Sequence, residues 1–180
     1  DKIIYILVEQ LPEGLYEIAK IQNKEKGNRI IDNTLMIEHA QRNSILKGLK
    51  NAVENDLIII SDVDEIPNLE QNDLRKNNKK IIHFKQNMFY YKFNLKYGSV
   101  PWYGSRACLK KNLISPQWLR DTKSKKYPLW RLDIFLSKSK YNSIHYVENG
   151  GWHFVNIKTP DEIEKKLKNF GHHWEYQLSG

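Results

Sequence analysis

The apolar positions of this chain form short runs of strand character and one longer stretch of helical period. Residues 2–8 and 57–60 are almost wholly apolar and rich in β-branched side chains, which is typical of buried strands. Between them, apolar and amphipathic residues recur at helical spacing, and Asn33 or Thr34 can cap the helix. This set comprises Leu35, His39, Arg42, Leu46, Leu49 and Val53. The order strand, helix, strand predicts a right-handed parallel crossover.

The second half of the chain alternates aromatic-rich strands with loops. We expect strands at residues 81–85, 88–93, 105–109, 144–147 and 152–155, a short helix at 69–77, and loops at 98–104 and 115–128. A final helix begins at Thr159, because Thr159, Pro160 and Glu162 form a capping box with proline in the first helical position. The pattern predicts a mixed α/β domain.

The strand at 57–60 is followed at once by acidic residues. Asp62, Asp64 and Glu65 fall within four positions, and Pro67 ends the run. In strand geometry Asp62 and Asp64 would share one face, where two carboxylates repel unless a cation lies between them. Carboxylate oxygens suit Mg²⁺ or Mn²⁺, and ligands of open α/β sheets bind at strand ends. The plainer interpretation is a solvated acidic turn.

Other polar groups could join such a site. Arg42 could reach a phosphate with its forked donors, and His153, which follows the glycine pair at 150–151, offers a nitrogen ligand. Each could equally be a surface or core residue. The terminal run 172–175, His-His-Trp-Glu, could also bind a ligand. Glu65, Asp133 and Glu148 remain candidate bases, each more often structural when taken singly.

Composition and charge narrow the classes of protein to which the chain could belong. The chain has 180 residues, 40% of them hydrophobic, which suits one globular domain. The net charge of +8 favours anionic partners such as nucleic acid, a membrane surface or a phosphorylated substrate, although the lysines are scattered. The single Cys108 excludes an internal disulfide and a cysteine-based zinc site. No apolar run reaches the roughly 20 residues of a membrane span.

Taken together, these motifs resemble glycosyltransferase family 17, the family of the β-1,4-mannosyl-glycoprotein 4-β-N-acetylglucosaminyltransferases. The resemblance is carried by Gln41-Arg42-Asn43, by the D-x-D-E-I-P run at 62–67, and by Gly151-Trp152-His153-Phe154 with the helix at Thr159 and the terminal His-Trp-Glu. It implies an α/β fold of the GT-A type, with a mixed, mostly parallel sheet flanked by helices. It also implies a segment upstream with the first strand and helix, so residues 1–180 are interpreted as a single catalytic domain that lacks this segment.

The resemblance also implies site roles. Asp62 and Asp64 match the D-x-D that holds Mn²⁺ (or Mg²⁺) against the donor diphosphate, and His153 matches a further metal ligand. Arg42 and Asn43 match a helix motif that faces the donor, which the resemblance implies is UDP-N-acetylglucosamine, and the transfer would invert the anomeric carbon. Apart from the resemblance, the aromatic stretch from Phe89 to Trp102, including Tyr91, together with Arg106 could form the acceptor side, because sugars stack on aromatic rings, or could equally belong to the core.

The sequence therefore predicts a metal-dependent inverting glycosyltransferase with a nucleotide-sugar donor, a glycan acceptor, no nucleic-acid partner and no transmembrane segment. Its composition, rich in Lys, Asn and Ile, favours a microbial source and a cytoplasmic location, and a eukaryotic member would lie in the Golgi lumen. Two rival interpretations remain. A nucleic-acid-binding module would use the basic charge and the aromatics, and a metal-dependent phosphohydrolase would use the same acidic site.

Overall fold

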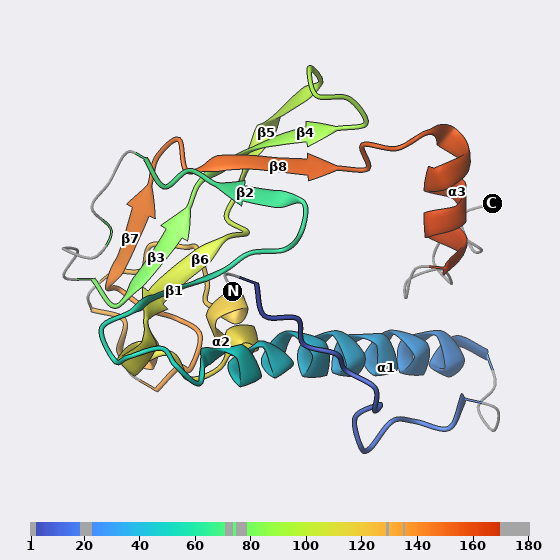
Figure 1. Cartoon of the computed structure of the whole chain (residues 1–180), viewed down its shortest axis with the longest axis horizontal. Helices are drawn as coiled ribbons and strands as arrows, with labels where there is room; N and C mark the ends of the chain where they lie inside the picture. The colour runs from blue at the N-terminus through green and yellow to red at the C-terminus, as the bar shows by residue number, and fades with distance from the viewer. Residues whose placement is uncertain are drawn as a thin grey trace. The chain divides into compact units, whose positions relative to one another are not determined.

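A computed structural model of the chain describes residues 3–18, 23–70, 74, 79–128, 130–134 and 136–169. The chain separates into two compact units, residues 1–49 with 158–180, and residues 50–157 (Figure 1). Helices are α1 (Asn23–Ser44), α2 (Pro116–Asp121) and α3 (Pro160–Asn169), with short 3₁₀ turns at Ile45–Leu49, Lys110–Asn112 and Leu132–Ile134. Strands are β1 (Leu57–Ile60), β2 (Glu65–Pro67), β3 (Ile81–Phe84), β4 (Gln86–Tyr90), β5 (Lys96–Trp102), β6 (Arg106–Leu109), β7 (Ile144–Val147) and β8 (Gly151–Val155).

The unit 50–157 contains two four-stranded sheets, with strand orders β1-β6-β3-β7 and β2-β8-β4-β5. Among the described residues only the β3–β7 and β4–β8 pairs are parallel, and the other four pairs are antiparallel. The prediction of a mostly parallel sheet is therefore wrong, whereas the mixed α/β class is confirmed. An apolar run such as 57–60 does not reveal the direction of its partner strand, and here it is the edge strand next to β6.

Four short connections lead directly from a strand of one sheet to a strand of the other, at one junction. The connections are residues 61–64 between β1 and β2, Lys85 between β3 and β4, 103–105 between β5 and β6, and 148–150 between β7 and β8. In Figure 1 each strand of one sheet leads into a strand of the other at this junction. Side chains on the connections 61–64 and 103–105 are thereby brought together, as the 2.6 Å contact between Ser61 Oγ and Ser105 Oγ shows.

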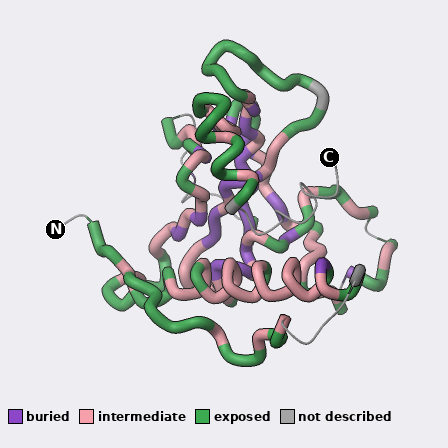
Figure 2. Tube along the Cα trace, turned by 90° about the vertical axis from the view of Figure 1, so that its right-hand side faces the viewer, coloured by how far each residue is buried: buried purple, intermediate pink, exposed green. Residues whose placement is uncertain are grey.

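The core of this unit lies in the strands. Leu74, Ile82, Phe84, Ala107 and Val147 form a buried cluster against which Leu57 and Ile59 pack. Figure 2 shows buried positions concentrated in the strands. Cys108 belongs to this interior, and burial raises the pKa of its thiol to about 12, so it is an inert core residue.

The unit that contains α1 departs from the sequence prediction at both of its first elements. Residues 3–8 are not a strand, and Ile3, Tyr5 and Leu7 are largely exposed. Further along the chain, Tyr16 is tied to α1 by paired hydrogen bonds between its backbone and the Asn33 amide. The predicted strand–helix–strand crossover is therefore absent from the described residues.

Helix α1 also begins about ten residues earlier than the caps predicted at Asn33 and Thr34, and it ends at Ser44. Thr34 lies inside the helix and donates to the Ile30 carbonyl four residues back, so it does not act as a cap. The polar run at 24–27 forms its first turn.

The predicted capping box of the last helix is confirmed. The Thr159 backbone N–H donates to Glu162 Oε2 at 2.9 Å, and the Glu162 N–H donates to Thr159 Oγ1 at 3.4 Å. The predicted strands at 81–85, 105–109 and 144–147 are confirmed, whereas the loop expected at 98–104 is mostly strand β5 and the loop at 115–128 contains α2. The helix expected at 69–77 lies largely outside the described residues. No helix among the described residues has the length and apolar character to cross a membrane.

Candidate functional site

The acidic residues after β1 form a turn between the two sheets. The Glu65 N–H donates to the Asp62 carbonyl at 3.0 Å, and β2 begins at Glu65. Asp62 and Asp64 therefore do not share a strand face, as the sequence analysis assumed. We call residues 61–65 the acidic turn. Its two aspartates face different partners, Arg120 for Asp62 and His153 for Asp64.

Glu65 is the buried centre of this turn, with 1% of its side chain exposed. Its Oε1 accepts from Trp102 Nε1 at 2.9 Å and from Arg120 Nη2 at 3.2 Å. Its Oε2 accepts from Arg120 Nη1 at 2.8 Å, from the Asp62 backbone N–H at 3.1 Å and from Ser105 Oγ at 3.4 Å. Five donor contacts thus surround one carboxylate, and they come from two of these connections, 61–64 and 103–105 with its flanking Trp102, and from Arg120 of α2.

The environment of Glu65 keeps its carboxylate ionised. Burial alone would raise the pKa of this carboxyl, but the hydrogen bonds and charge of Arg120 outweigh burial, and Asp62 N–H and Trp102 add to the effect. The net pKa lies below its ordinary value. Glu65 is therefore a saturated ion-pair partner, and its lone pairs are already occupied by donors.

The space for this ion pair depends on Gly104. A Cβ atom on Gly104 would lie 1.7 Å from Glu65 Oε1 and 2.2 Å from Trp102 Nε1, and the Gly104 carbonyl also accepts from Arg120. Behind it, Ser105 Oγ lies 2.6 Å from Ser61 Oγ and accepts from Gln86 Nε2 at 3.1 Å. The network therefore continues from the acidic turn into the interior of the junction.

His153 faces Asp64 across the β2–β8 ladder. Its Nε2 lies 3.5 Å from Asp64 Oδ2, and its ring stacks on Trp102 with centroids 4.6 Å apart. The ring is nearly buried, whereas 40% of the Asp64 side chain is exposed. In the part of the chain that the structure describes, His153 Nδ1 is buried without a hydrogen-bond partner. Asp64 and His153 thus form one polar pair at the surface end of the junction.

The glycine pair before His153 serves backbone packing. A Cβ on Gly151, whose φ is +119°, would lie 2.0 Å from the Ile66 carbonyl, and one on Gly150 would lie 2.7 Å from the Lys85 nitrogen. The Asn68 N–H donates to the Gly150 carbonyl at 2.9 Å. The glycines therefore bring β8 close to β2 and to the β3–β4 link, which is a different close approach from the ligand contact suggested by the sequence.

Only two of the three predicted metal ligands lie next to each other. Asp64 and His153 are paired, whereas Asp62 Oδ2 accepts from Arg120 Nη2 at 2.7 Å. Across the described ranges, no group of three or more His, Cys, Asp or Glu side chains is placed to hold a metal ion by itself. Any cation here would need ligands from a bound molecule as well.

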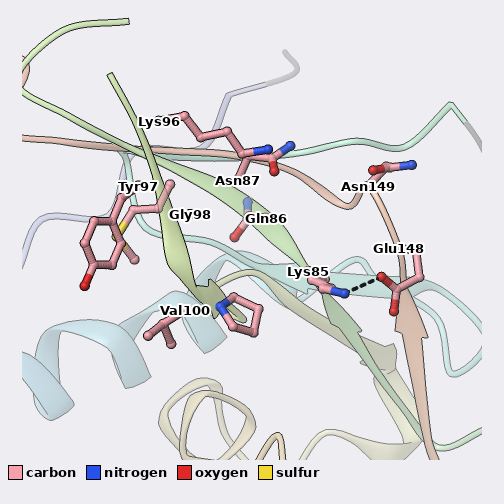
Figure 3. Close-up of a pocket in the computed structure, with 11 residues that line it drawn as sticks. Lys85, Gln86, Asn87, Lys96, Tyr97, Gly98, Val100, Glu148 and Asn149 are labelled. Carbon is pink, nitrogen blue, oxygen red and sulfur yellow. Dashed lines mark hydrogen bonds and ion pairs between the residues drawn. The ribbon is translucent and has the colours of Figure 1, made fainter. Parts of the chain in front are cut away.

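Glu148 and Asp133, the other candidate bases, belong to different surroundings. Glu148 pairs with Lys85 at 2.7 Å beside a cavity of about 380 Å³ that Asn87, Lys96 and Asn149 also line (Figure 3). Asn87 is in register with Trp152, so its side chain points to the sheet face opposite His153.

Asp133 is exposed and accepts from both Arg131 and Lys140, which hold the pKa of its carboxyl well below the usual range. The structure therefore groups Glu65 alone of the three candidates with the acidic turn.

The predicted acceptor residues also separate. Trp102 belongs to the acidic-turn network, and Tyr91 lies half exposed at the end of the β4–β5 hairpin with φ of +63°. Arg106 is partly buried and donates to the Tyr103 and Leu119 carbonyls and to Thr122, so it fastens the end of α2. Arg42 and Asn43 lie in the last turn of α1 in the other unit, and residues 172–175 lie outside the described residues.

The sequence reasoning missed Arg120, Ser105 and Gln86. Arg120 is 55 residues from Glu65 in the chain and sits on a helix of six residues. That helix does carry a start signal, since the Ser115 side chain accepts from the Trp118 N–H and Pro116 follows. Nothing local connects its fifth residue to an acidic turn.

The model of glycosyltransferase family 17 matches residues 14–176. No curated protein and no solved structure matches the chain. The matched range includes all of the unit 50–157, most of the other unit and every residue of the acidic-turn network.

Proposed function

The chain belongs to glycosyltransferase family 17 and is therefore a glycosyltransferase, and we propose that it moves N-acetylglucosamine from UDP-N-acetylglucosamine to a glycan hydroxyl, with inversion. We place the donor diphosphate at the acidic turn. The observation that supports this placement is the Asp64–His153 pair, 3.5 Å apart and partly exposed, next to the rigid Glu65–Arg120 network.

A divalent cation fits this pair. Two neighbouring ligands of an octahedral ion at about 2.1 Å lie about 3 Å apart, so a small shift brings Asp64 Oδ2 and His153 Nε2 onto one ion. Two protein ligands with phosphate oxygens and waters are a usual set for Mg²⁺ in nucleotide sites, and the imidazole nitrogen favours Mn²⁺. When bound, such an ion would stabilise the negative charge that develops on the departing diphosphate.

The protein residues contribute position and environment. Trp102 covers the His153 ring and fixes its plane, so that Nε2 stays directed at Asp64. Glu65 anchors the turn, because its carboxylate accepts a hydrogen bond from the Asp62 backbone N–H. The predicted acceptor residue closest to this centre is Trp102, and we propose that the acceptor approaches on its side.

Calorimetric titration of UDP in the presence and absence of Mn²⁺ tests the proposal. We expect binding that needs Mn²⁺ and that falls at least tenfold in Asp64→Asn. The control is Glu164→Gln, which also removes one exposed carboxylate, here from an i,i+4 pair with Lys168 on α3, and should leave the affinity unchanged. A UDP affinity that changes neither without Mn²⁺ nor in Asp64→Asn would overturn the proposed site. Phosphate release from simple esters without an acceptor would support the phosphohydrolase rival.

A further inference from the structure

Arg120 joins two carboxylates of the acidic turn, the buried Glu65 and the partly exposed Asp62. Its Nη1 donates to Glu65 Oε2 and to the Gly104 carbonyl, and its Nη2 donates to Asp62 Oδ2 and to Glu65 Oε1. Each terminal nitrogen carries two N–H groups, so these four acceptors use all four of them. The terminal nitrogens thus have no N–H left for a phosphate oxygen, and the guanidinium acts on the turn instead of on a ligand.

The guanidinium is itself held firmly. Only 12% of the Arg120 side chain is exposed, and its main partner Glu65 is anchored by Trp102 and by the Asp62 N–H. The helix that carries Arg120 begins at the Ser115 cap and is fastened at its end by Arg106, which donates to the Leu119 carbonyl. A fork between two carboxylates in such a setting fixes both of them in orientation.

Asp62 is the residue that this arrangement controls. Its backbone N–H donates to Glu65 Oε2 while its carboxylate accepts from Arg120, so it is gripped at both ends. Nevertheless 40% of its side chain is exposed. A carboxylate that is fixed from the protein side and open on the other loses little freedom when a ligand arrives, which lowers the entropic cost of binding.

We propose that Arg120 is a positioning residue for donor binding: together with Glu65 it fixes Asp62 and the acidic turn in the shape that receives the donor diphosphate. This inference rests on the function proposed above. It makes Glu65 a positioning residue as well, and it gives Arg120 a role in donor binding without direct contact with the donor.

The first test measures the turn without any ligand. Arg120→Lys keeps the charge but loses the fork, so its effect reports geometry. We expect amide hydrogen exchange of the peptide containing residues 61–65 to accelerate about tenfold in Arg120→Lys, while exchange in β7 stays as in the wild type. Unchanged exchange at 61–65 overturns the proposal, whatever the donor proves to be.

The second test measures UDP affinity in the presence of Mn²⁺. Arg120→Lys should weaken UDP binding about tenfold or more. The matched control is Trp118→Phe on the same helix, which removes the indole N–H that contacts the Lys138 carbonyl and the Tyr141 hydroxyl but touches neither Asp62 nor Glu65. This control should lower the melting temperature and leave UDP affinity unchanged. Equal losses of UDP affinity in both variants would mean that Arg120 acts only through stability, and would overturn the proposal.

A second variant covers the case in which Arg120→Lys does not fold. The double substitution Glu65→Gln with Arg120→Gln replaces the buried charge pair with neutral amides that can still hydrogen-bond, and should fold. We expect it also to bind UDP at least tenfold more weakly, and wild-type affinity would overturn the proposal. A wild-type protein that binds no UDP would refute the donor proposed above, while hydrogen exchange would still decide whether Arg120 orders the turn.

Discussion

Glu65 and Asp133 are two carboxylates whose pKa values are lowered for different reasons. Burial opposes ionisation of Glu65, and Arg120 overcomes it, whereas Asp133 is exposed and is held by Arg131 and Lys140. A general base works best with a pKa near the operating pH. Both carboxyls are displaced away from that range and both are already engaged by cationic donors, so neither is poised to accept a proton from an acceptor hydroxyl.

Asp133→Asn should therefore leave kcat within about threefold of the wild type, because the lost carboxylate only pairs with Arg131 and Lys140 at the surface. Steady-state kinetics with a saturating donor would measure this. A fall of a hundredfold or more would instead make Asp133 the base. The same kcat measurement on Glu148→Gln tests the candidate base that lies on the sheet face away from His153.

His83 gives the protein a pH dependence of stability. The side chain is fully buried, with Nε2 2.9 Å from Thr122 Oγ1, and burial followed by the charge of Arg106 lowers its pKa to about 3. The unfolded chain takes up a proton at this residue near pH 6.5, whereas the folded protein does not until about pH 3. Proton uptake by the unfolded state alone means that stability falls as pH decreases between these values.

We expect the free energy of unfolding to fall by about 2 kcal/mol between pH 6.5 and 5 from this residue, at about 1.4 kcal/mol per pH unit. Urea unfolding measured across this range would show it, and His83→Gln should remove about one proton from the pH slope. His145→Gln, in the neighbouring strand β7, serves as the comparison. An identical slope in His83→Gln and the wild type would disprove the assignment.

At the scale of elements, the β7–β8 turn depends on glycine for a steric reason. Gly151 has a φ of +119°, and a side chain there would collide with the Ile66 carbonyl of the paired strand. Gly98 in β5 has no atom within 4 Å of the position that a Cβ would take. The two glycines therefore make a matched pair, because a Cβ atom has no room at Gly151 and has free space at Gly98.

Gly151→Ala should lower the free energy of unfolding by about 3 kcal/mol or more, because it combines backbone strain with a clash between strands. Gly98→Ala should change it by less than about 1 kcal/mol. Chemical denaturation monitored by tryptophan fluorescence would measure both. A tolerated Gly151→Ala would indicate that β2 and β8 do not pair as described.

Local signals in the sequence predicted several helices and strands, whereas the contacts between residues far apart in the chain could not be predicted. Strand 144–147 and the Thr159 capping box follow from adjacent residues, and both are confirmed. The Glu65–Arg120 ion pair joins residues 55 positions apart, and no period in the sequence encodes it.

The direction of strand pairing was beyond prediction for a similar reason. The run at 57–60 is apolar because its alternate side chains enter a core, whether its partner runs parallel or antiparallel. The acidic site could be located from the sequence because its residues are contiguous. Its second layer, formed by Arg120, Ser105 and Gln86, comes from three other segments of the chain.

At the scale of the whole molecule, the net charge of +8 separates the proposed function from the nucleic-acid rival. The residues most strongly organised in the unit 50–157 are acidic, and they would repel a phosphate backbone unless a cation intervened. Basic charge spread over a surface still attracts polyanions weakly, and such binding falls steeply with salt because each neutralised phosphate releases counterions. UDP carries only two phosphates, so its salt dependence should be shallow.

We therefore expect the affinity for a single-stranded oligonucleotide to fall about a hundredfold or more between 50 and 200 mM salt, while UDP affinity in Mn²⁺ falls less than about fivefold. Fluorescence anisotropy with a labelled 20-mer and calorimetry with UDP, in the same buffers, would measure the two slopes. Asp64→Asn should weaken UDP binding and leave oligonucleotide binding equal or slightly stronger, because it removes a negative charge. Micromolar oligonucleotide binding that persists at 200 mM salt would favour nucleic acid as the partner, since general electrostatic attraction cannot produce it.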